Sequence, residues 1–414
     1  MTDKNNGVLV HREWYESKVR PFMDKPLVKI LSGIRRSGKS SVLRLVADSI
    51  LESGVATDRV IFLNMESMEH DLYKDIDVLR QHVRRRRAEQ GQRLYLFIDE
   101  IQEIPGWERA VNSFLADDDA DIYISGSNSR LLSGELATPL SGRCVEFTIF
   151  PLSFGEFLEF RGVSAAAEGA FLDFLRFGGF PGIHRLEFSE ATIHQYLSSL
   201  ADSVLLKDVV MRNKVRDVAL LHSLLLFIAG NIGNIFSTRS VADCLKKERR
   251  SLGVETIYNY LSWLESAFVI HKVPRFDIKG KRLLETHGKY YLADLGLRHT
   301  LLGYREKDIG VFLENVVYIE LRKRAYLVRI GKLDDLEVDF IATRGDERIY
   351  IQVAHLLADE ATREREFRPL RLIPDNHPKY VLSMDRTPPG DDAGIFRMYL
   401  PDFLAAQGHQ DHAF

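Results

Sequence analysis

The sequence predicts an α/β protein that begins with a parallel sheet covered by helices on both faces and continues with a helical region and a smaller α/β domain. Between about Pro26 and Pro151, short apolar runs alternate with longer segments in which apolar residues recur at helical spacing. Strands that alternate with helices favour a parallel sheet whose two faces are both buried. After Pro151 the pattern changes, because helical segments come first and short apolar runs return near residue 290.

The elements of the first region follow in order along the chain. We expect buried strands at residues 28–32, 60–63, 94–98, 122–125 and 144–149, each a short apolar run. The segments 39–52, 69–89 and 104–116 have helical spacing. We expect this first domain to comprise residues 1–150.

The second region, residues 151–280, is expected to be mostly helical and to end in a two-helix unit. Ser237 is a good capping residue for the first of these helices, and Ile257, Leu261 and Leu264 belong to an apolar stripe in the second. The segment VIHKVPRFDIKGKRLL then predicts a hairpin. Helix, turn, helix and basic hairpin is the order of a winged helix.

The third region, residues 281–414, predicts the smaller α/β domain. Short apolar runs at 290–292, 326–330, 338–342 and 349–353 indicate strands, and residues 311–323 indicate a helix before the last three.

Composition excludes several classes of protein. Apolar residues make up 45% and charged residues 28% of the 414 residues, and the net charge is −3, so the chain is not coated with positive charge for nucleic acid. Cys144 and Cys244 are the two cysteines, which predicts neither a disulfide framework nor a cysteine-rich metal site. The most apolar stretch, residues 218–236, contains a histidine and two asparagines and predicts a buried helix rather than a membrane span. We expect a cytoplasmic protein.

The most informative motif is GIRRSGKS at residues 33–40, which matches G-x-x-x-x-G-K-[ST] between a strand and a helix. Glycines let the backbone turn its amides toward phosphate, and the helix N-terminus adds partial positive charge. We expect Lys39 to bridge the β- and γ-phosphates of ATP and Ser40 to ligate Mg²⁺. The whole expected nucleotide-binding set is Gly33, Ile34, Arg35, Arg36, Ser37, Gly38, Lys39, Ser40 and Ser41. The alternative is a helix that merely follows a glycine turn.

The two arginines of the motif raise a question of charge. Lys39 and the loop amides already suit a triphosphate, so Arg35 and Arg36 need not both point inward. One of them is expected to contact the nucleotide or a facing subunit while the other contacts an acidic neighbour.

A metal partner for the motif follows the apolar run LYLFI, as Asp99 and Glu100. The carboxyl ends of strands in an open parallel sheet face the ligand crevice. Asp99 is expected to hold Mg²⁺, and Glu100 to orient and polarise the attacking water. A glutamate after the metal-binding aspartate favours hydrolysis over transfer to an acceptor substrate. The alternative is a charged strand end that turns into solvent.

Two further residues are candidates for catalysis. Ser127 and Asn128 follow the next strand, where either could reach the γ-phosphate or its water; the alternative is the cap of a helix that begins near Arg130. Arg143, on the turn LSGR, is expected to reach a neighbouring subunit's nucleotide and neutralise charge in the transition state. A surface ion pair is the alternative for Arg143.

The segments GIRRSGKS, LFIDEIQ, SGSNSRLLS, LSGR and PLSFGEFLEF together resemble bacterial and archaeal AAA-type ATPases of the ATP-binding protein family that bears domain of unknown function 4143. TIYNYLSWLESAFVIHKVPRFDIKGK, YLADLGLR, FLENVVYIELRKR and EVDFIATRGDERIYIQVA resemble its C-terminal half, and the match spans roughly Arg12 to Ala354.

The resemblance implies an AAA ATPase core with a P-loop NTPase sheet, a winged-helix-like middle and a restriction-endonuclease-like C-terminal domain. It carries over Lys39 and Ser40 as nucleotide residues, Asp99 and Glu100 as the metal and water pair, Ser127 as the sensor and Arg143 as an arginine finger. It does not carry a biological role.

The nuclease-like domain departs from the pattern of an active nuclease, which needs converging carboxylates and a lysine beside the attacking water. Glu314 and Asp339 supply carboxylates, but Gln352 replaces a third carboxylate and Ala354 stands where the lysine is expected. An amide brings no charge and alanine handles no proton. We interpret the domain as a remnant that binds rather than cuts; an active Mg²⁺-dependent nuclease is the alternative.

Basic residues at 246–250 and 279–282 fall on the winged-helix unit and would contact DNA if they share a face; the alternative is a packing module. The leading hypothesis is an ATP-binding and hydrolysing AAA-type protein, a nucleotide-driven switch or machine with a C-terminal docking module for nucleic acid or a protein partner. The alternative is an ATP-binding scaffold with negligible turnover. No membrane partner is expected, and Arg143 is compatible with a homo-oligomer.

Overall fold

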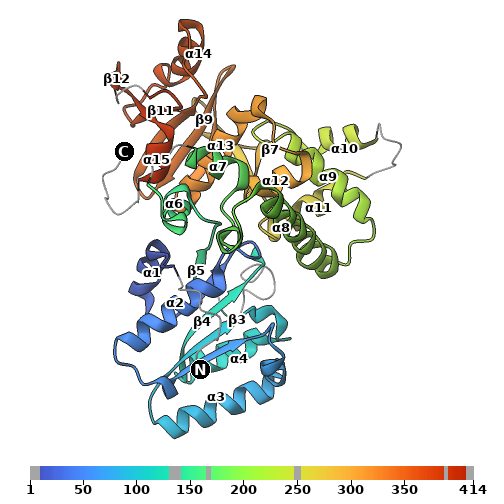
Figure 1. Cartoon of the computed structure of the whole chain (residues 1–414), viewed down its shortest axis with the longest axis vertical. Coiled ribbons are helices and arrows are strands. Elements are labelled where there is room, and N and C mark those ends of the chain that lie inside the picture. Colours follow the sequence, from blue (N-terminus) through green and yellow to red (C-terminus); the bar gives the residue numbers. More distant parts are fainter. Residues whose placement is uncertain are drawn as a thin grey trace. The chain divides into compact units, whose positions relative to one another are not determined.

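The chain folds as two units, Met1–Ile149 and Phe150–Phe414, in a computed structural model (Figure 1). The structure describes residues 10–129, 140, 142–164, 169–246, 253–386 and 390–406, without the side chains of 244–246, 285 and 286. Each unit has its own sheet, one of five strands and one of eight.

The sheet of the first unit is entirely parallel, with strand order β2-β3-β4-β1-β5. The fold class predicted for this region is therefore confirmed, and the strands end within two residues of the predicted positions. The strands are β1 (Val28–Ser32), β2 (Val60–Asn64), β3 (Leu94–Asp99), β4 (Ala120–Gly126) and β5 (Cys144–Thr148).

Helices cover both faces of this sheet because alternate residues of the central strands point to opposite sides. On one face, Ile30 and Leu96 share a core with α3 and α4. On the other face, Phe97 and Tyr123 share a core with α1 and α2. The helices are α1 (Glu13–Val19), α2 (Lys39–Glu52), α3 (Ile76–Gln90) and α4 (Trp107–Ala116), with 3-10 turns η1 (Arg20–Phe22), η2 (Thr57–Arg59), η3 (Met68–Lys74) and η4 (Ile101–Glu103).

Two helices begin later than the spacing of apolar residues predicted. The α-helical part of the segment 69–89 begins at Ile76, because the extended residue Asp75 caps it by accepting hydrogen bonds from the amides of Asp77 and Val78. Likewise, α4 begins at Trp107, after Gly106 in the left-handed conformation. In both cases the residue that directly precedes the helix sets where the helix begins.

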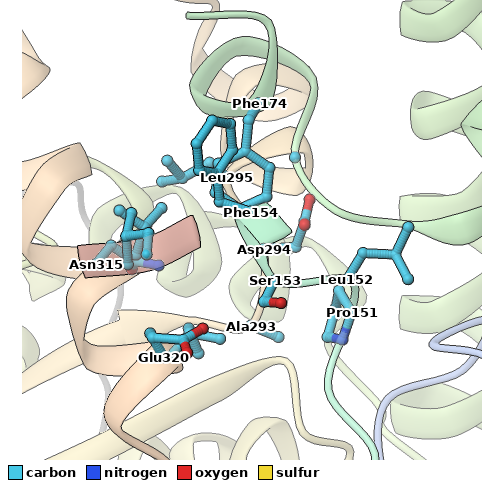
Figure 2. Close-up of a pocket in the computed structure, with 14 residues that line it drawn as sticks. Pro151, Leu152, Ser153, Phe154, Phe174, Ala293, Asp294, Leu295, Asn315 and Glu320 are labelled. Carbon is cyan, nitrogen blue, oxygen red and sulfur yellow. The ribbon is translucent and has the colours of Figure 1, made fainter. Parts of the chain in front are cut away.

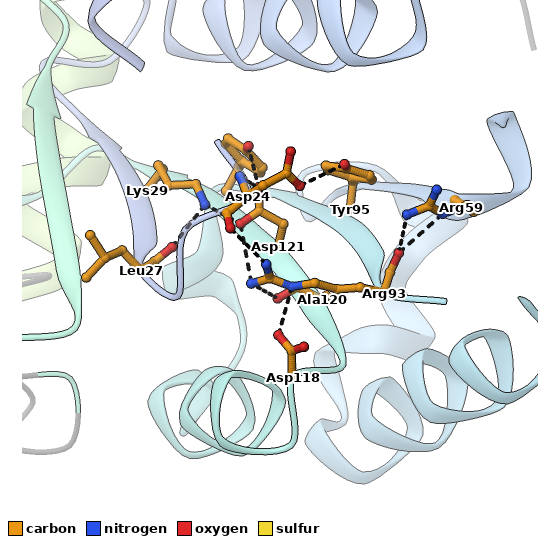
Figure 3. Close-up of polar contacts among 10 residues, drawn as sticks. Asp24, Leu27, Lys29, Arg59, Arg93, Tyr95, Asp118, Ala120 and Asp121 are labelled. Atoms are coloured by element: carbon orange, nitrogen blue, oxygen red, sulfur yellow. Dashed lines mark hydrogen bonds and ion pairs between the residues drawn. The ribbon is translucent and has the colours of Figure 1, made fainter. Parts of the chain in front are cut away.

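A buried polar network joins β1 to β4 near the edge where these strands begin (Figure 3). The ammonium of Lys29 pairs with the carboxylate of Asp121, and both side chains are fully buried. The same carboxylate accepts hydrogen bonds from the Tyr123 hydroxyl at 2.6 Å and the Asp24 amide at 3.0 Å, and the Arg93 guanidinium lies 3.6 Å away. Burial lowers the pKa of Lys29, although its pairing with Asp121 opposes that shift.

The sheet of the second unit is mixed, with strand order β12-β13-β11-β10-β9-β8-β6-β7. Three neighbouring pairs run parallel, namely β10 with β11, β11 with β13, and β6 with β8. The strands are β6 (Ile270–Asp277), β7 (Arg282–Leu292), β8 (Leu327–Leu333), β9 (Leu336–Arg344), β10 (Glu347–Val353), β11 (Lys379–Ser383), β12 (Gly390–Asp392) and β13 (Ile395–Tyr399).

The helical region and the small α/β region that the sequence predicted are both present in the second unit. The first part of the apolar stretch 218–236 forms the helix α9, which ends at Gly230 and buries leucines and an isoleucine. The helices are α6 (Phe154–Arg161), α7 (Ala170–Phe177), α8 (Glu190–Ser203), the π-helix η7 (Val204–Met211), α9 (Val218–Gly230), α10 (Thr238–Lys246), α11 (Val254–Ser266), α12 (Leu295–Leu302), α13 (Ile309–Lys323), α14 (Glu360–Arg371) and α15 (Leu400–Ala405), with 3-10 turns η6 (Pro181–Arg185) and η8 (Glu306–Asp308).

The hairpin predicted after the two-helix unit forms as β6 and β7. It continues the eight-stranded sheet, because residues 275–277 of β6 pair with residues 330–332 of β8. The sheet thus contains strands from both sides of residue 280. The winged-helix interpretation stays a prediction, and residues 247–250 of its basic segment lie outside the described part of the chain.

Among the helices that the structure describes, none combines the length and the apolar character needed to cross a membrane.

Candidate functional site

The predicted site residues of the first unit, apart from Arg143, lie at the edge where the parallel strands end. The loop 33–38 follows β1, Asp99 ends β3, and Ser127 follows β4. Because β4 lies between β3 and β1, its end separates the carboxylates from the loop by one strand. This edge is where ligands bind in open parallel sheets.

The loop between β1 and α2 depends on glycine at two positions. Gly33 has φ +145°, and a Cβ there would lie 2.2 Å from the carbonyl oxygen of Ile149. Gly38 has φ +100° and precedes the first residue of α2. A side chain would be strained at either place, so the motif's two glycines are required by the path of the backbone.

Lys39 is buried, and its side chain points back toward the first residues of the loop. Its ammonium donates hydrogen bonds to the carbonyl oxygens of Gly33 at 3.1 Å and Ile34 at 3.2 Å, and lies 3.8 Å from Oε1 of Glu100. The lysine therefore connects the start of the loop with the end of β3. Ser40 is exposed in the first turn of α2, where unpaired helix amides and the helix dipole favour an anion.

Asp99 and Glu100 are buried and are both held by a residue that the sequence did not single out. The Ser125 hydroxyl donates a hydrogen bond to Oδ1 of Asp99 and accepts one from the Glu100 amide at 3.1 Å. Glu100 has φ +56°, a strained conformation for a residue with a side chain, and its Oε2 accepts a hydrogen bond from the Gln102 amide group. Ser125 thus ties the Asp99 carboxylate and the Glu100 backbone to β4.

Arg35 and Arg36 diverge. The Arg35 guanidinium forms a 2.7 Å ion pair with Glu66, whereas Arg36 is exposed and has φ +66°. One of the two arginines therefore contacts an acidic neighbour, as the sequence predicted. Ser127 is fully buried directly after β4, and Ser37 is buried within the loop.

A further residue that sequence reasoning missed is Arg12. Its guanidinium is buried, donates a 2.9 Å hydrogen bond to the carbonyl oxygen of Ser37 in the loop, and lies 4.5 Å from the centre of the Tyr15 ring. The N-terminal segment therefore contacts the loop 33–38 directly. No motif or spacing in the sequence pointed to this contact.

Arg143 is not part of this edge of the sheet. It immediately precedes β5, and its carbonyl oxygen accepts a hydrogen bond from the amide of Val28, the first residue of β1. Because β5 runs parallel to β1, Arg143 lies at the opposite edge, about 15 Å from the loop at the usual rise per strand residue. It is exposed, 3.4 Å from the side-chain oxygen of Asn112. It does not reach the loop of its own chain, so its predicted role requires a neighbouring subunit.

The residues predicted for the nuclease-like region of the second unit lie on adjacent elements, Glu314 on α13, Asp339 on β9 and Gln352 on β10. The Gln352 side-chain oxygen accepts a hydrogen bond from the Asp339 amide at 3.3 Å, and its nitrogen donates to Glu366 at 3.0 Å. Within the described residues, no three histidines, cysteines or carboxylates are arranged to hold a metal ion. Burial, with Glu314 as a smaller contribution, raises the pKa of Asp339 to about 8.

The second unit also contains an open pocket, whose lining residues include Phe154, Asp294 and Asn315 (Figure 2). Asp294, labelled in its wall, accepts hydrogen bonds from the amides of Gly179 at 2.6 Å and Gly296 at 2.7 Å, and burial raises its pKa to about 6. Asn315 bonds to both backbone groups of Leu292. These polar side chains are engaged in joining elements of the fold, which is a structural role.

The comparisons with known proteins agree with the geometry of the first unit. A family model described as an AAA domain matches residues 25–158, so this part of the chain is of the AAA type. A second model, described as domain of unknown function DUF8612, matches residues 168–308. The C-terminal part of the resemblance named domain 4143, which these matches do not show.

The chain belongs to the family of an uncharacterized protein of Haemophilus influenzae, to which it is 38% identical over 399 residues, covering 96% of this chain and 98% of that protein. The uncharacterized protein MJ1544 of Methanocaldococcus jannaschii is 31% identical over 355 residues, covering 82% of this chain and 77% of its own length. Among solved structures, the Aeropyrum pernix Orc1 protein in complex with DNA is 16% identical with a TM-score of 0.31, covering 71% of this chain and 92% of that one. A likeness at that TM-score supports no conclusion about this chain.

Proposed function

We propose that the first unit binds ATP with Mg²⁺ at the loop 33–40 and hydrolyses it, so that the protein works as a nucleotide-driven switch or machine. The observation that carries this proposal is the position of Lys39. Its ammonium lies within the loop and 3.8 Å from Glu100, so one cation links the predicted phosphate cradle to the predicted water-activating carboxylate. A triphosphate at the N-terminus of α2 would be a further anionic partner for this ammonium.

The side chains present suit a magnesium ion, because Asp99 and Ser40 offer the oxygen donors that Mg²⁺ prefers. When bound, the ion would neutralise charge on the phosphates. Asp99 is already oriented by Ser125, and Glu100 would accept a hydrogen bond from the attacking water. Ser127, buried after β4, would sense the γ-phosphate or its water. These roles are inferred from placement and chemistry.

Arg143 would contribute only across an interface between copies of the chain, whereas Arg36 would contact either the nucleotide or a facing subunit. Arg143 is exposed at the far edge of the sheet, and Arg36 is exposed on the loop. A neighbouring copy would have to present its Arg143 to this loop, which makes the proposed role dependent on a homo-oligomer. Measurement of the mass in solution with and without ATP tests that dependence.

The second unit is proposed to be a docking module for nucleic acid or a protein partner. The same proposal divides it at residue 280 into a winged-helix-like domain and a nuclease-like domain. Its support is the nuclease-like set Glu314, Asp339 and Gln352, in which an amide side chain is engaged with the backbone. The alternative of an active nuclease predicts metal-dependent cleavage of plasmid or single-stranded DNA that Asp339→Ala abolishes.

A second candidate function is an ATP-binding scaffold without appreciable turnover. It is favoured by the contacts of Glu100, whose carboxylate accepts a hydrogen bond from Gln102 and lies 3.8 Å from the Lys39 ammonium. Phosphate release separates the two functions. For hydrolysis, Glu100→Gln should retain bound ATP and lose phosphate release, and Lys39→Ala should lose ATP binding.

Lys74→Ala is the matched control for the lysine variant, since Lys74 forms an exposed ion pair with Asp71 on the same unit. It should bind and hydrolyse ATP as the unaltered protein does. Phosphate release by Glu100→Gln at the rate of the unaltered protein would refute the proposed role of Glu100. If neither the unaltered protein nor Glu100→Gln releases phosphate, the ATP-binding scaffold is favoured.

A further inference from the structure

A lysine ammonium lies in the centre of the carboxylate cluster of the second unit. Nζ of Lys289, on β7, is 2.6 Å from Oε1 of Glu314, 2.8 Å from Oε1 of Glu337 and 3.8 Å from Oδ1 of Asp339. The Lys289 side chain is 4% exposed, and those of Glu314, Asp339 and Glu337 are 12%, 11% and 31% exposed. The cluster is therefore mostly withdrawn from solvent and contains its own cation.

The geometry around Lys289 is that of hydrogen bonds and ion pairs. An ammonium has three donors and bonds to oxygen at about 2.7–3.2 Å. Magnesium needs about six oxygen ligands near 2.0–2.1 Å. The lysine enters from β7, between the carboxylates of α13 and β9, where a divalent cation of a nuclease would have to be bound.

The remaining groups that a metal ion would use are engaged elsewhere. The Tyr291 hydroxyl donates to the same oxygen of Glu314 that faces Lys289. The second oxygen of Asp339 accepts a hydrogen bond from the Val353 amide at 2.9 Å. The Gln352 oxygen is turned to the Asp339 amide. With the Lys289 ammonium in place, the residues of this cluster therefore do not fit a magnesium ion.

We propose that Lys289 takes the place of the divalent cation in this cluster, and that it acts as a fixed counter-ion that holds β7, α13 and β9 together. The nuclease-like region consequently binds no divalent metal at these carboxylates. The positive charge that a catalytic metal would bring is supplied by the lysine of β7. This inference does not depend on ATP binding by the first unit.

Replacement of the ammonium tests the proposal. Lys289→Met keeps much of the side-chain length but leaves three partly buried carboxylates without their cation, so the melting temperature of the nucleotide-free protein should fall by at least about 5 °C. Addition of millimolar Mn²⁺ should recover part of that loss, because a cation that binds only the folded state stabilises it. The same Mn²⁺ should stabilise the unaltered protein less.

Two further variants locate the effect. Lys323→Met removes an ammonium that lies 3.1 Å from the buried carboxylate of Glu156, and this variant should be destabilised without rescue by Mn²⁺. Lys289→Met combined with Glu314→Gln should lose the rescue, because one of the vacated ligands becomes a neutral amide. Nucleotide is absent throughout, so the result is separate from the proposed ATPase activity.

The proposal is overturned if folded Lys289→Met shows no greater response to Mn²⁺ than the unaltered protein. It is also overturned if the unaltered protein binds an Mn²⁺ ion that Asp339→Asn fails to bind. The second comparison does not require Lys289→Met to fold, and equal Mn²⁺ binding by these two proteins supports the proposal.

Discussion

Ser125→Ala is expected to impair the use of magnesium while leaving ATP binding without metal intact. The Ser125 hydroxyl donates to the carboxylate of Asp99 and accepts from the Glu100 amide, so it positions the proposed metal ligand and the proposed general base together. Alanine removes both contacts without adding bulk to a fully buried position.

The expected magnitude follows from these two hydrogen bonds. A hydrogen bond to a charged group contributes about 1.5–3 kcal/mol, and loss of a partner that orients a metal ligand typically weakens metal affinity by about 10–100-fold. The Mg²⁺ concentration that gives half-maximal phosphate release should therefore rise by about 10–100-fold. The unpaired Glu100 amide should also cost about 1–3 kcal/mol of unfolding free energy.

The assay is a Mg²⁺ titration of phosphate release at saturating ATP, together with ATP binding measured in EDTA. Ser113→Ala is the control, since Ser113 is a partly exposed serine of α4 away from the strand ends. An unchanged Mg²⁺ midpoint for Ser125→Ala would refute the positioning role. Equal losses of binding in EDTA and of the Mg²⁺ response would indicate general damage to the fold.

Lys29→Met should lower the unfolding free energy of the first unit by about 3–5 kcal/mol in chemical denaturation, because it leaves the fully buried Asp121 without its ammonium. The double variant Lys29→Met with Asp121→Asn should recover part of this loss. Equal unfolding free energies for Lys29→Met and the unaltered protein would contradict the prediction. Burial and the nearby Arg161 lower the pKa of His184 to about 4, below the ordinary value of 6.5, so its contribution to stability is present above pH 6.5 and is lost as pH falls toward 4. Since neither ring nitrogen of His184 has a hydrogen-bond partner, His184→Leu should raise the melting temperature more at pH 5 than at pH 8. An equal rise at both pH values would contradict the lowered pKa of His184.

Much of the first unit could be predicted because its signals are local. An apolar run followed by GIRRSGKS places glycines, lysine and helix N-terminus within a few residues of one another, whatever the rest of the chain does. Asp99 and Glu100 were predicted in the same way, because they directly follow a second apolar run, LYLFI. The start of α3 at Ile76 was also a local signal, because Asp75 is a good capping residue, although the prediction followed the spacing of apolar residues alone.

The contacts of Ser125 and Arg12 could not be predicted, because they depend on which segments become neighbours. The period of a strand shows that it is buried, but not that β4 lies between β3 and β1. Arg143 differs, since a residue that precedes a parallel strand lies at the edge opposite to residues that follow strands. Its distance from the loop of its own chain could therefore have been deduced once the parallel sheet was predicted.

The two units place a lysine beside carboxylates in different ways, and the difference bears on where a ligand can bind. Lys39 donates hydrogen bonds to two backbone carbonyls of the loop and lies 3.8 Å from Oε1 of Glu100, at the N-terminus of α2, where a helix favours an anion such as a triphosphate. Lys289 bonds at 2.6 and 2.8 Å to two carboxylates and lies near a third. Withdrawal of Lys289 would leave buried negative charge unpaired, which is costly. Nucleotide and metal chemistry are therefore expected at the first lysine, while the second serves the stability of the fold.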